Sequence, residues 1–283
     1  GQTSALEQSA GTTVDLNKTT QTVGQLNSDQ GSLFNFNGGN LTLTNGGQVD
    51  GLLSGDGNLN LTGGTLTLSQ ANTGYTGETT IASGANGVVS NAAGLGSGNI
   101  VNQGQLTLDG VTGTVANAIS NSGELSILDS SGVILSGDNS NFSGSIYTDA
   151  TSQLQVSSAS QLGSANVENS GRLVLESSDK WSLTNSISGT GTLVKSGQGT
   201  VQILNSTVSA ANTLIEDGIL QLGADTPTAN YQIQSASQSE GLELDASDNS
   251  TTLASNVTID QNGTLGGFGR VTGNVDNAGR LVM

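Results

Sequence analysis

Carboxylates are the first side chains to consider for chemistry in this sequence, because it contains no His and no Cys. Without them, neither a Ser-His-Asp triad nor a Cys-His nucleophile can be built, and the usual zinc sites are excluded. Hydrolysis of a glycosidic bond would need two carboxyl groups facing one another across the ligand. The closest groupings are Glu216 beside Asp217, and a looser set made of Glu240, Glu243, Asp245 and Asp248.

Neither grouping is expected to form a catalytic pair. Successive residues of a strand point to opposite faces, so Glu216 and Asp217 diverge. Glu243 and Asp245 share one face of a short strand, which we interpret as a solvated outer face with Leu242 and Leu244 pointing inward. We therefore expect no catalytic residue, no metal ligand and no cofactor-binding residue, and the chain is predicted not to be an enzyme.

Two aromatic residues, Tyr75 and Trp181, are candidates for stacking on a sugar ring or for contact with another cell. The alternative, which we favour for both, is partial burial at a corner or under a loop. A specific nucleic-acid partner is not expected, because the net charge is −17 and such partners require a basic surface.

The composition is unusual for a globular protein, with 42 Gly, 1 Pro, 10% charged and 3% aromatic residues among 283. Such a composition is often disordered. Here short apolar pairs, for example Leu41-x-Leu43 and Leu66-x-Leu68, recur along the whole chain. Their recurrence favours a thin core in which the same aliphatic side chains stack from repeat to repeat, as in solenoid proteins.

A repeat unit is clearest in residues 189–222, has an earlier copy in residues 55–84 and a weaker one in residues 133–146. The three copies share Asn72, Asn139 and Asn212, which lie 67 and 73 residues apart. If each interval covers three turns of a coil, one turn takes about 22 to 24 residues, which is typical of solenoids. These Asn side chains are predicted to bond from turn to turn inside the coil rather than to bind a ligand.

A shorter pattern, Asn-x-Gly-x-(Leu/Val), begins at Asn45, Asn102, Asn121, Asn169 and Asn277. It predicts a tight corner followed by a strand, because Asn and Gly tolerate the left-handed backbone conformation. A β-sandwich or barrel would instead need antiparallel hairpins with two-residue turns. Corners repeated at nearly constant spacing favour an all-β, right-handed parallel β-helix.

These repeats resemble the passenger domains of adhesin-type (AIDA-like) autotransporters of Gram-negative bacteria, which carry passenger-associated, or autotransporter-associated, strand repeats. Residues 189–222 lack the Tyr-Thr-Gly centre of that repeat, and residues 55–84 lack its Lys and its final Gly-x-Leu-x-Leu. The residues that match are Gly189, Gly191, Leu193, Lys195, Gly197, Gly199, Asn212, Thr213, Ile215, Gly218, Leu220 and Leu222, and, in the earlier copy, Asn72, Thr73, Tyr75, Gly77, Thr80 and Ile81.

The end of the chain is similar to the segment that precedes the membrane β-barrel in these proteins, through Gly263, Leu265, Gly267, Gly269, Val271 and Gly273. The resemblance implies a pectin-lyase-like β-helix, with residues 1–188 as a stem and residues 189–283 as the autochaperone region that nucleates folding outside the cell. No cofactor is implied.

The resemblance also implies export by type V secretion through the protein's own outer-membrane β-barrel translocator, to the cell surface or beyond it. The implied function is that of a non-enzymatic adhesin or self-association stem, with a host-surface ligand or a second copy as its partner and a role in biofilm or virulence. Two alternatives stay open. One is a carbohydrate-active β-helix that binds or hydrolyses polysaccharide, and the other is an inert stalk that presents a distal domain.

Overall fold

The computed structural model describes residues 4–204, 207–223, 230–234, 241–244 and 251–282, and divides into two compact units, residues 1–147 and 148–283. Each unit is a parallel β-solenoid, so the predicted all-β parallel β-helix is confirmed. Among the described residues the only helix is a three-residue 3-10 turn, η1 (Ala159–Gln161). The described part of the chain therefore contains no helix with the length and apolar character needed to cross a bilayer.

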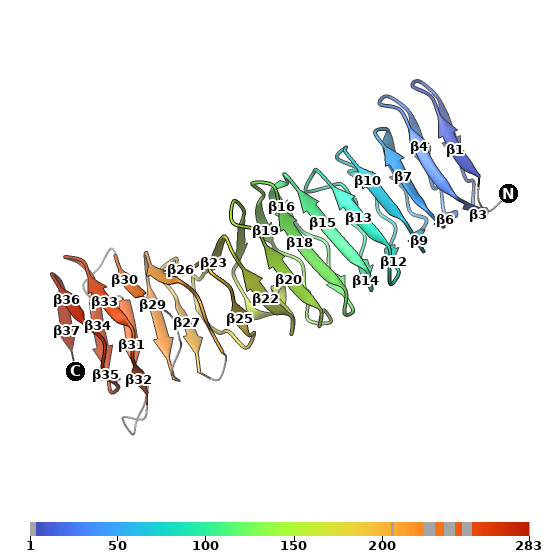
Figure 1. The fold of residues 1–283 in the computed structure, drawn as a ribbon. Coiled ribbons are helices and arrows are strands. Elements are labelled where there is room, and N and C mark those ends of the chain that lie inside the picture. The colour runs from blue at the N-terminus through green and yellow to red at the C-terminus, as the bar shows by residue number, and fades with distance from the viewer. Residues whose placement is uncertain (1–3, 205–206, 224–229, 235–240, 245–250, 283) are drawn as a thin grey trace. The chain divides into compact units, whose positions relative to one another are not determined.

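Unit 1 is built from three parallel sheets, in which neighbouring strands come from successive turns (Figure 1). Sheet A contains β1 (Ala5–Gln8), β4 (Gln25–Ser28), β7 (Gly46–Val49), β10 (Thr65–Leu68), β13 (Asn86–Val89), β15 (Gln105–Asp109), β18 (Glu124–Leu128) and β20 (Ser145–Thr148). Sheet B contains β2 (Thr13–Asp15), β5 (Leu33–Asn35), β8 (Leu52–Gly55) and β11 (Gly74–Tyr75). Sheet C contains β3 (Thr20–Val23), β6 (Asn40–Leu43), β9 (Leu59–Leu61), β12 (Thr79–Ile81), β14 (Ile100–Asn102) and β17 (Ile119–Ser120). A further pair joins β16 (Thr112–Val115) to β19 (Gly132–Leu135).

Unit 2 repeats the same construction with two long sheets. Sheet D contains β21 (Gln153–Val156), β23 (Arg172–Glu176), β26 (Thr192–Ser196), β28 (Asn212–Ile215), β30 (Asn230–Ile233), β33 (Asn256–Ile259) and β36 (Val275–Asn277). Sheet E contains β24 (Lys180–Ser182), β27 (Thr200–Ile203), β29 (Ile219–Leu222), β31 (Gly241–Leu244), β34 (Thr264–Gly267) and β37 (Arg280–Val282). Two shorter pairs join β22 (Asn166–Asn169) to β25 (Ile187–Ser188), and β32 (Thr252–Leu253) to β35 (Arg270–Val271).

The core consists of columns of aliphatic side chains, one from each turn. In sheet E the register stacks Val201, Leu220, Leu242 and Leu265, and all four are buried. Burying each such side chain contributes about 1.5–3 kcal/mol. The two-residue alternation that the sequence predicts is therefore what assigns these residues to the inside of the coil.

A turn takes about 20 residues, fewer than the 22 to 24 predicted from the spacing of the repeats. Thr192 pairs with Asn212, and Ala5 pairs with Gln25. The prediction failed because the repeat copies do not sit at the same corner. The copy around Asn72 leads into β11 of sheet B, whereas the copy around Asn139 leads into Phe142, which bridges to Asn121 directly after β17 of sheet C. Asn212 differs again, because it is the first residue of β28 in sheet D, with its side chain exposed.

The motif that begins at Asn72 and at Asn139 can occupy different corners of the coil because it forms a hydrogen-bonded turn within itself. The backbone N–H of Tyr75 donates to the carbonyl of Asn72, and the N–H of Phe142 donates to the carbonyl of Asn139. Each bond spans three residues and needs no particular sheet on either side. The number of residues between two copies is therefore not a whole number of turns.

Glycine is required at many corners for close packing rather than for a left-handed backbone. In the Asn-x-Gly pattern, Asn121 and Gly47 have the predicted positive φ, whereas Gly104, Gly123 and Gly171 do not, contrary to the prediction. A Cβ on any of these last three glycines would overlap backbone atoms of the preceding turn. The same holds for a column of glycines in unit 1, where a Cβ on Gly57 would overlap the carbonyl oxygen of Gly39.

We predict that Gly57→Ala lowers the free energy of unfolding by about 3 kcal/mol, because the added methyl group must push two stacked backbones apart. The matched control is Gly132→Ala, since Gly132 has ordinary φ and open space where its Cβ would be. Denaturant titration of both variants checks this prediction. Equal midpoints for the two would show that the turns can separate at little cost.

Candidate functional site

The repeat motif of residues 189–222 folds as two consecutive turns that stack on one another. Its first half supplies β26 and β27, and its second half supplies β28 and β29. β26 pairs with β28 and β27 pairs with β29, so that Leu193 lies beside Thr213 and Val201 beside Leu220. The spacing of the motif is thus the length of one turn.

The structure buries most of the predicted motif residues. Those that face the core are Leu193, Lys195, Thr213, Ile215, Leu220 and Leu222, together with Asn72, Tyr75 and Ile81 of the earlier copy and Leu265 of the last motif. At every motif glycine a Cβ would overlap the preceding turn: Gly77, Gly189, Gly191, Gly197, Gly199, Gly218, Gly263, Gly267, Gly269 and Gly273. Thr80 and Val271 are half-buried, and Thr73 and Asn212 are exposed.

Lys195 occupies an inner column of sheet D, between Leu175 and Ile215. Its side chain is fully buried. Its Nζ donates hydrogen bonds to the carbonyl oxygens of Ser196 (2.7 Å), Gly197 (2.5 Å) and Asp217 (3.1 Å). An ammonium group carries three N–H donors, so these three carbonyls match its capacity. Because Asp217 belongs to the next turn, the ammonium joins two turns across a corner.

Gly218 completes this arrangement. It has a φ of 67°, in the left-handed region. A Cβ at this position would lie 2.7 Å from the Nζ of Lys195. The Lys and the glycine that follows it by one turn are therefore one structural unit, which explains why the motif contains both.

Buried Asn amides make similar connections in unit 1. The Oδ1 of Asn72 accepts from the N–H of Leu53 in the turn before (2.8 Å), and its Nδ2 donates to the carbonyl of Gly94 in the turn after (2.7 Å). The Oδ1 of Asn139 accepts from the N–H of Ile119 (2.7 Å). The prediction that these side chains bond from turn to turn inside the coil is right for both, although they bond to backbone groups and not to one another. Each connection satisfies polar groups that would be costly to bury alone. The prediction is wrong for Asn212, whose side chain is exposed and accepts a hydrogen bond from Asn230 on the outer face.

The Asn-x-Gly pattern contributes two further connections of this kind. The Nδ2 of Asn102 donates to the carbonyl of Glu124 (2.8 Å), and the Nδ2 of Asn169 donates to the carbonyl of Thr192 (3.1 Å). Asn117 and Asn185 are also buried, and each amide reaches two carbonyls of the preceding turn. These last two were not predicted from the sequence, because neither Asn is followed by Gly at the second position.

Neither candidate aromatic residue is a surface platform. Tyr75 is fully buried, its ring centroid lies 4.8 Å from that of Phe36, and its hydroxyl donates to the carbonyl of Glu78 (2.9 Å). Burial raises the pKa of the Tyr75 hydroxyl to about 12. Trp181 is half-buried, and its Nε1 donates to the carbonyl of Glu176 (3.2 Å). The alternative favoured from the sequence, burial at a corner, therefore describes both better than a binding role.

The structure also gives a position or a partner for each acidic candidate residue that it describes. Glu216 pairs with Arg172, with 2.6 Å between Oε1 and Nη2, while the backbone carbonyl of Asp217 accepts from Lys195. Glu243 is half-buried on β31, while Glu240, Asp245 and Asp248 lie outside the described residues. No group of three or more His, Cys, Asp or Glu side chains gathers as a metal site in the described part of the chain.

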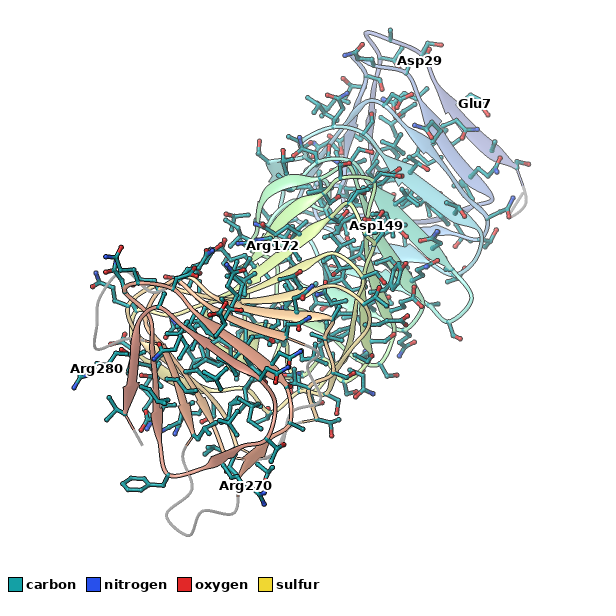
Figure 2. All side chains as sticks on the ribbon, turned by 60° about the vertical axis from the view of Figure 1, so that its left-hand side comes forward. Glu7, Asp29, Asp149, Arg172, Arg270 and Arg280 are labelled. Atoms are coloured by element: carbon teal, nitrogen blue, oxygen red, sulfur yellow. The ribbon has the colours of Figure 1, made fainter. Side chains whose placement is uncertain are left out.

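An open hollow of about 580 Å³ lies on the outer face of sheet D. The side chains along it come from five successive strands, β23 to β33: Arg172, Thr192, Asn212, Leu214, Asn230, Gln232 and Thr258. The Arg172–Glu216 ion pair reaches across the intervening strand β26, where the outward position is taken by a buried residue, Val194. Figure 2 labels Arg172 among the side chains of the outer surface. No pattern in the sequence predicted this hollow.

Two proteins of Escherichia coli K-12 are similar to this chain. It is 39% identical over 259 residues to an uncharacterized lipoprotein, YdeK, an alignment that covers 91% of this chain and 19% of that protein. It is 40% identical over 283 residues to an uncharacterized protein, YuaQ, with 99% of this chain and 19% of that protein covered. The chain thus spans about a fifth of the length of these relatives. No protein-family model matches it, and no solved structure does.

We predict that Lys195→Met lowers the free energy of unfolding by about 1–3 kcal/mol, because the methionine keeps an apolar stem of similar length but leaves three carbonyls without their donor. Lys180→Met, at an exposed position of β24, is the matched control and should be nearly neutral. The pair can be compared by thermal or denaturant unfolding. If both lose the same amount, the buried ammonium is not what joins the turns.

Proposed function

We propose that this chain is a segment of a long, non-enzymatic surface protein of the autotransporter passenger type, exported through its own outer-membrane β-barrel translocator. The observation that carries the proposal is how turns are joined. Hydrogen bonds, aliphatic columns and buried Lys and Asn side chains connect each turn to the one before and the one after. A chain of this kind folds by adding one turn to the last.

Sequential folding supports a role in secretion. As the chain emerges from a pore, each new turn buries its Leu, Val and Ile side chains on an existing turn, and the free energy released opposes backward movement. The absence of Cys fits this role, because no disulfide can form before the chain has crossed the membrane. Residues 189–283 remain our candidate for the region that folds first. The boundary between the two compact units follows residue 147 and reflects compactness, not the order of folding.

The relatives add a location to the proposal. One of the two similar E. coli proteins is named a lipoprotein, which supports a membrane-associated or surface position for proteins built from this kind of segment. The acidic, largely polar exterior suits an exposed position, where net charge keeps a protein soluble. At the surface, the segment would act as an adhesin or self-association stem, and it would contact a host ligand or another copy through its flat outer faces.

The secretion role predicts that Leu220→Asp together with Leu222→Asp slows surface display severalfold. Both side chains are buried in inner columns of sheet E, and an Asp in either cannot stack on the turn before it. The matched control is Ser182→Asp with Thr184→Asp, two exposed positions that flank the buried Leu183. Display is followed by surface labelling of bacteria that express the full-length parent protein. Normal display of the Leu220→Asp, Leu222→Asp variant would contradict the secretion role.

The self-association role predicts that removing residues 1–188 from the displayed parent protein abolishes clumping while the surface level stays unchanged. Clumping is measured by sedimentation and surface level by labelling of the same cells. Unchanged clumping would make this segment a spacer, in line with the inert-stalk alternative. A fall in surface level would instead assign its main work to secretion.

A further inference from the structure

Sheet A of unit 1 and sheet D of unit 2 differ in how far their outward polar side chains bond to one another. On sheet A of unit 1 these side chains bond to one another. Gln105 donates to Glu124 (2.9 Å), Ser126 donates to the same carboxylate (2.5 Å), and Thr107 donates to Asn86 (3.2 Å). A face whose polar groups satisfy each other has little left to offer a ligand.

Sheet D of unit 2 has polar groups that remain available. Asn230 donates to Asn212 at 3.3 Å, which uses one atom of each amide, and leaves the Oδ1 of Asn230 and the Nδ2 of Asn212 without a partner among the described residues. Thr192 and Thr258 make no side-chain hydrogen bond with any described part of the chain. All four side chains line the hollow of about 580 Å³. This volume lies in the range of small-molecule and cofactor sites.

The register sets these groups out in a regular row. Thr192, Asn212 and Asn230 are direct neighbours on successive strands, so they repeat at about 4.8 Å. Leu214 lies beside the row at the next outward position and is half-buried, which provides one apolar contact in the hollow. The hollow therefore combines evenly spaced hydroxyl and amide groups with an apolar surface.

Charge limits what can bind there. Among the described residues that line the hollow, Arg172 is the one cation, and Glu216 holds it at 2.6 Å. Gln232 donates to Asp260 (3.5 Å), which uses its amide nitrogen. This lining thus carries no unpaired positive charge to attract an anion, and the net charge of −17 repels one. A neutral ligand fits best.

The position on a sheet face excludes one common mode of recognition. Extended peptides are usually bound along a sheet edge, where backbone N–H and C=O groups are free. On the face of sheet D those groups are already used between strands. Recognition must come from side-chain hydroxyls and amides, which complement the hydroxyls of a sugar, while its C–H surface packs on Leu214.

We propose that this hollow is a binding site for a neutral glycan, held by Thr192, Asn212, Asn230 and Thr258 over Leu214. The site rests on the proposed surface function and gives it a ligand class. It corresponds to the binding form, and not the hydrolytic form, of the carbohydrate-active alternative considered from the sequence, because the polar groups available in its lining are hydroxyls and amides.

The test uses the purified chain of residues 1–283 on an array that carries neutral, sialylated and sulfated glycans. Neutral glycans retained on the array are then titrated as free oligosaccharides by calorimetry. We expect retention of neutral glycans, and an affinity at least tenfold weaker for the double variant Asn212→Ala with Asn230→Ala. The matched control is Asn40→Ala with Asn60→Ala, two outward Asn residues of sheet C. It should bind as the wild type does, and thermal unfolding checks that both variants are folded.

Three outcomes overturn the site: retention of no glycan, retention of charged glycans alone, or equal affinity of the two double variants. None of these touches the proposed function, which is tested by display and clumping of the parent protein. Conversely, specific glycan binding with normal display of the Leu220 and Leu222 variant would keep the site and remove the secretion role.

Discussion

The structure depends on how closely successive turns approach one another. Parallel strands must lie about 4.8 Å apart to form their hydrogen bonds, and this spacing continues around the corners, where no sheet holds the backbones. At those corners the backbones touch, and only a residue without a Cβ fits between them, as at Gly57 over Gly39 and at Gly77 over Gly57. Many of the glycines that make the sequence look disordered are thus a requirement of its order.

Polar groups inside the coil follow from the same constraint. A corner turns the backbone away from the sheet and leaves carbonyl and amide groups without strand partners, in a place that water does not reach. The buried amides of Asn72 and Asn102 and the ammonium of Lys195 fill these gaps, and each does so by bonding to a neighbouring turn. Specificity of stacking therefore resides at the corners, while the aliphatic columns between them supply most of the burial.

Much of this fold could be predicted from the sequence, because few folds other than a solenoid combine period-two apolar pairs with corners that recur along the whole chain. The inward assignment of Leu220 and Leu222 followed directly from that alternation, and both are buried. The turn length could not be predicted, since the Asn72 and Asn139 motifs make the same local bond at different corners. The hollow on sheet D could not be predicted from the sequence either, because it depends on which strands lie side by side. Arg172 and Glu216 are 44 residues apart and give no local signal of their pairing.

The burial of Lys195 has a consequence for the resistance of the chain to proteolysis. Proteases of the trypsin type cut after Lys and Arg, and the chain has only 6 such residues. Cleavage needs the basic side chain to enter the protease, but the ammonium of Lys195 is held inside the coil by carbonyls of two turns. The peptide bond after Lys195 therefore becomes cleavable only after the two turns separate. A protease of the trypsin type would find few cleavage sites along the chain.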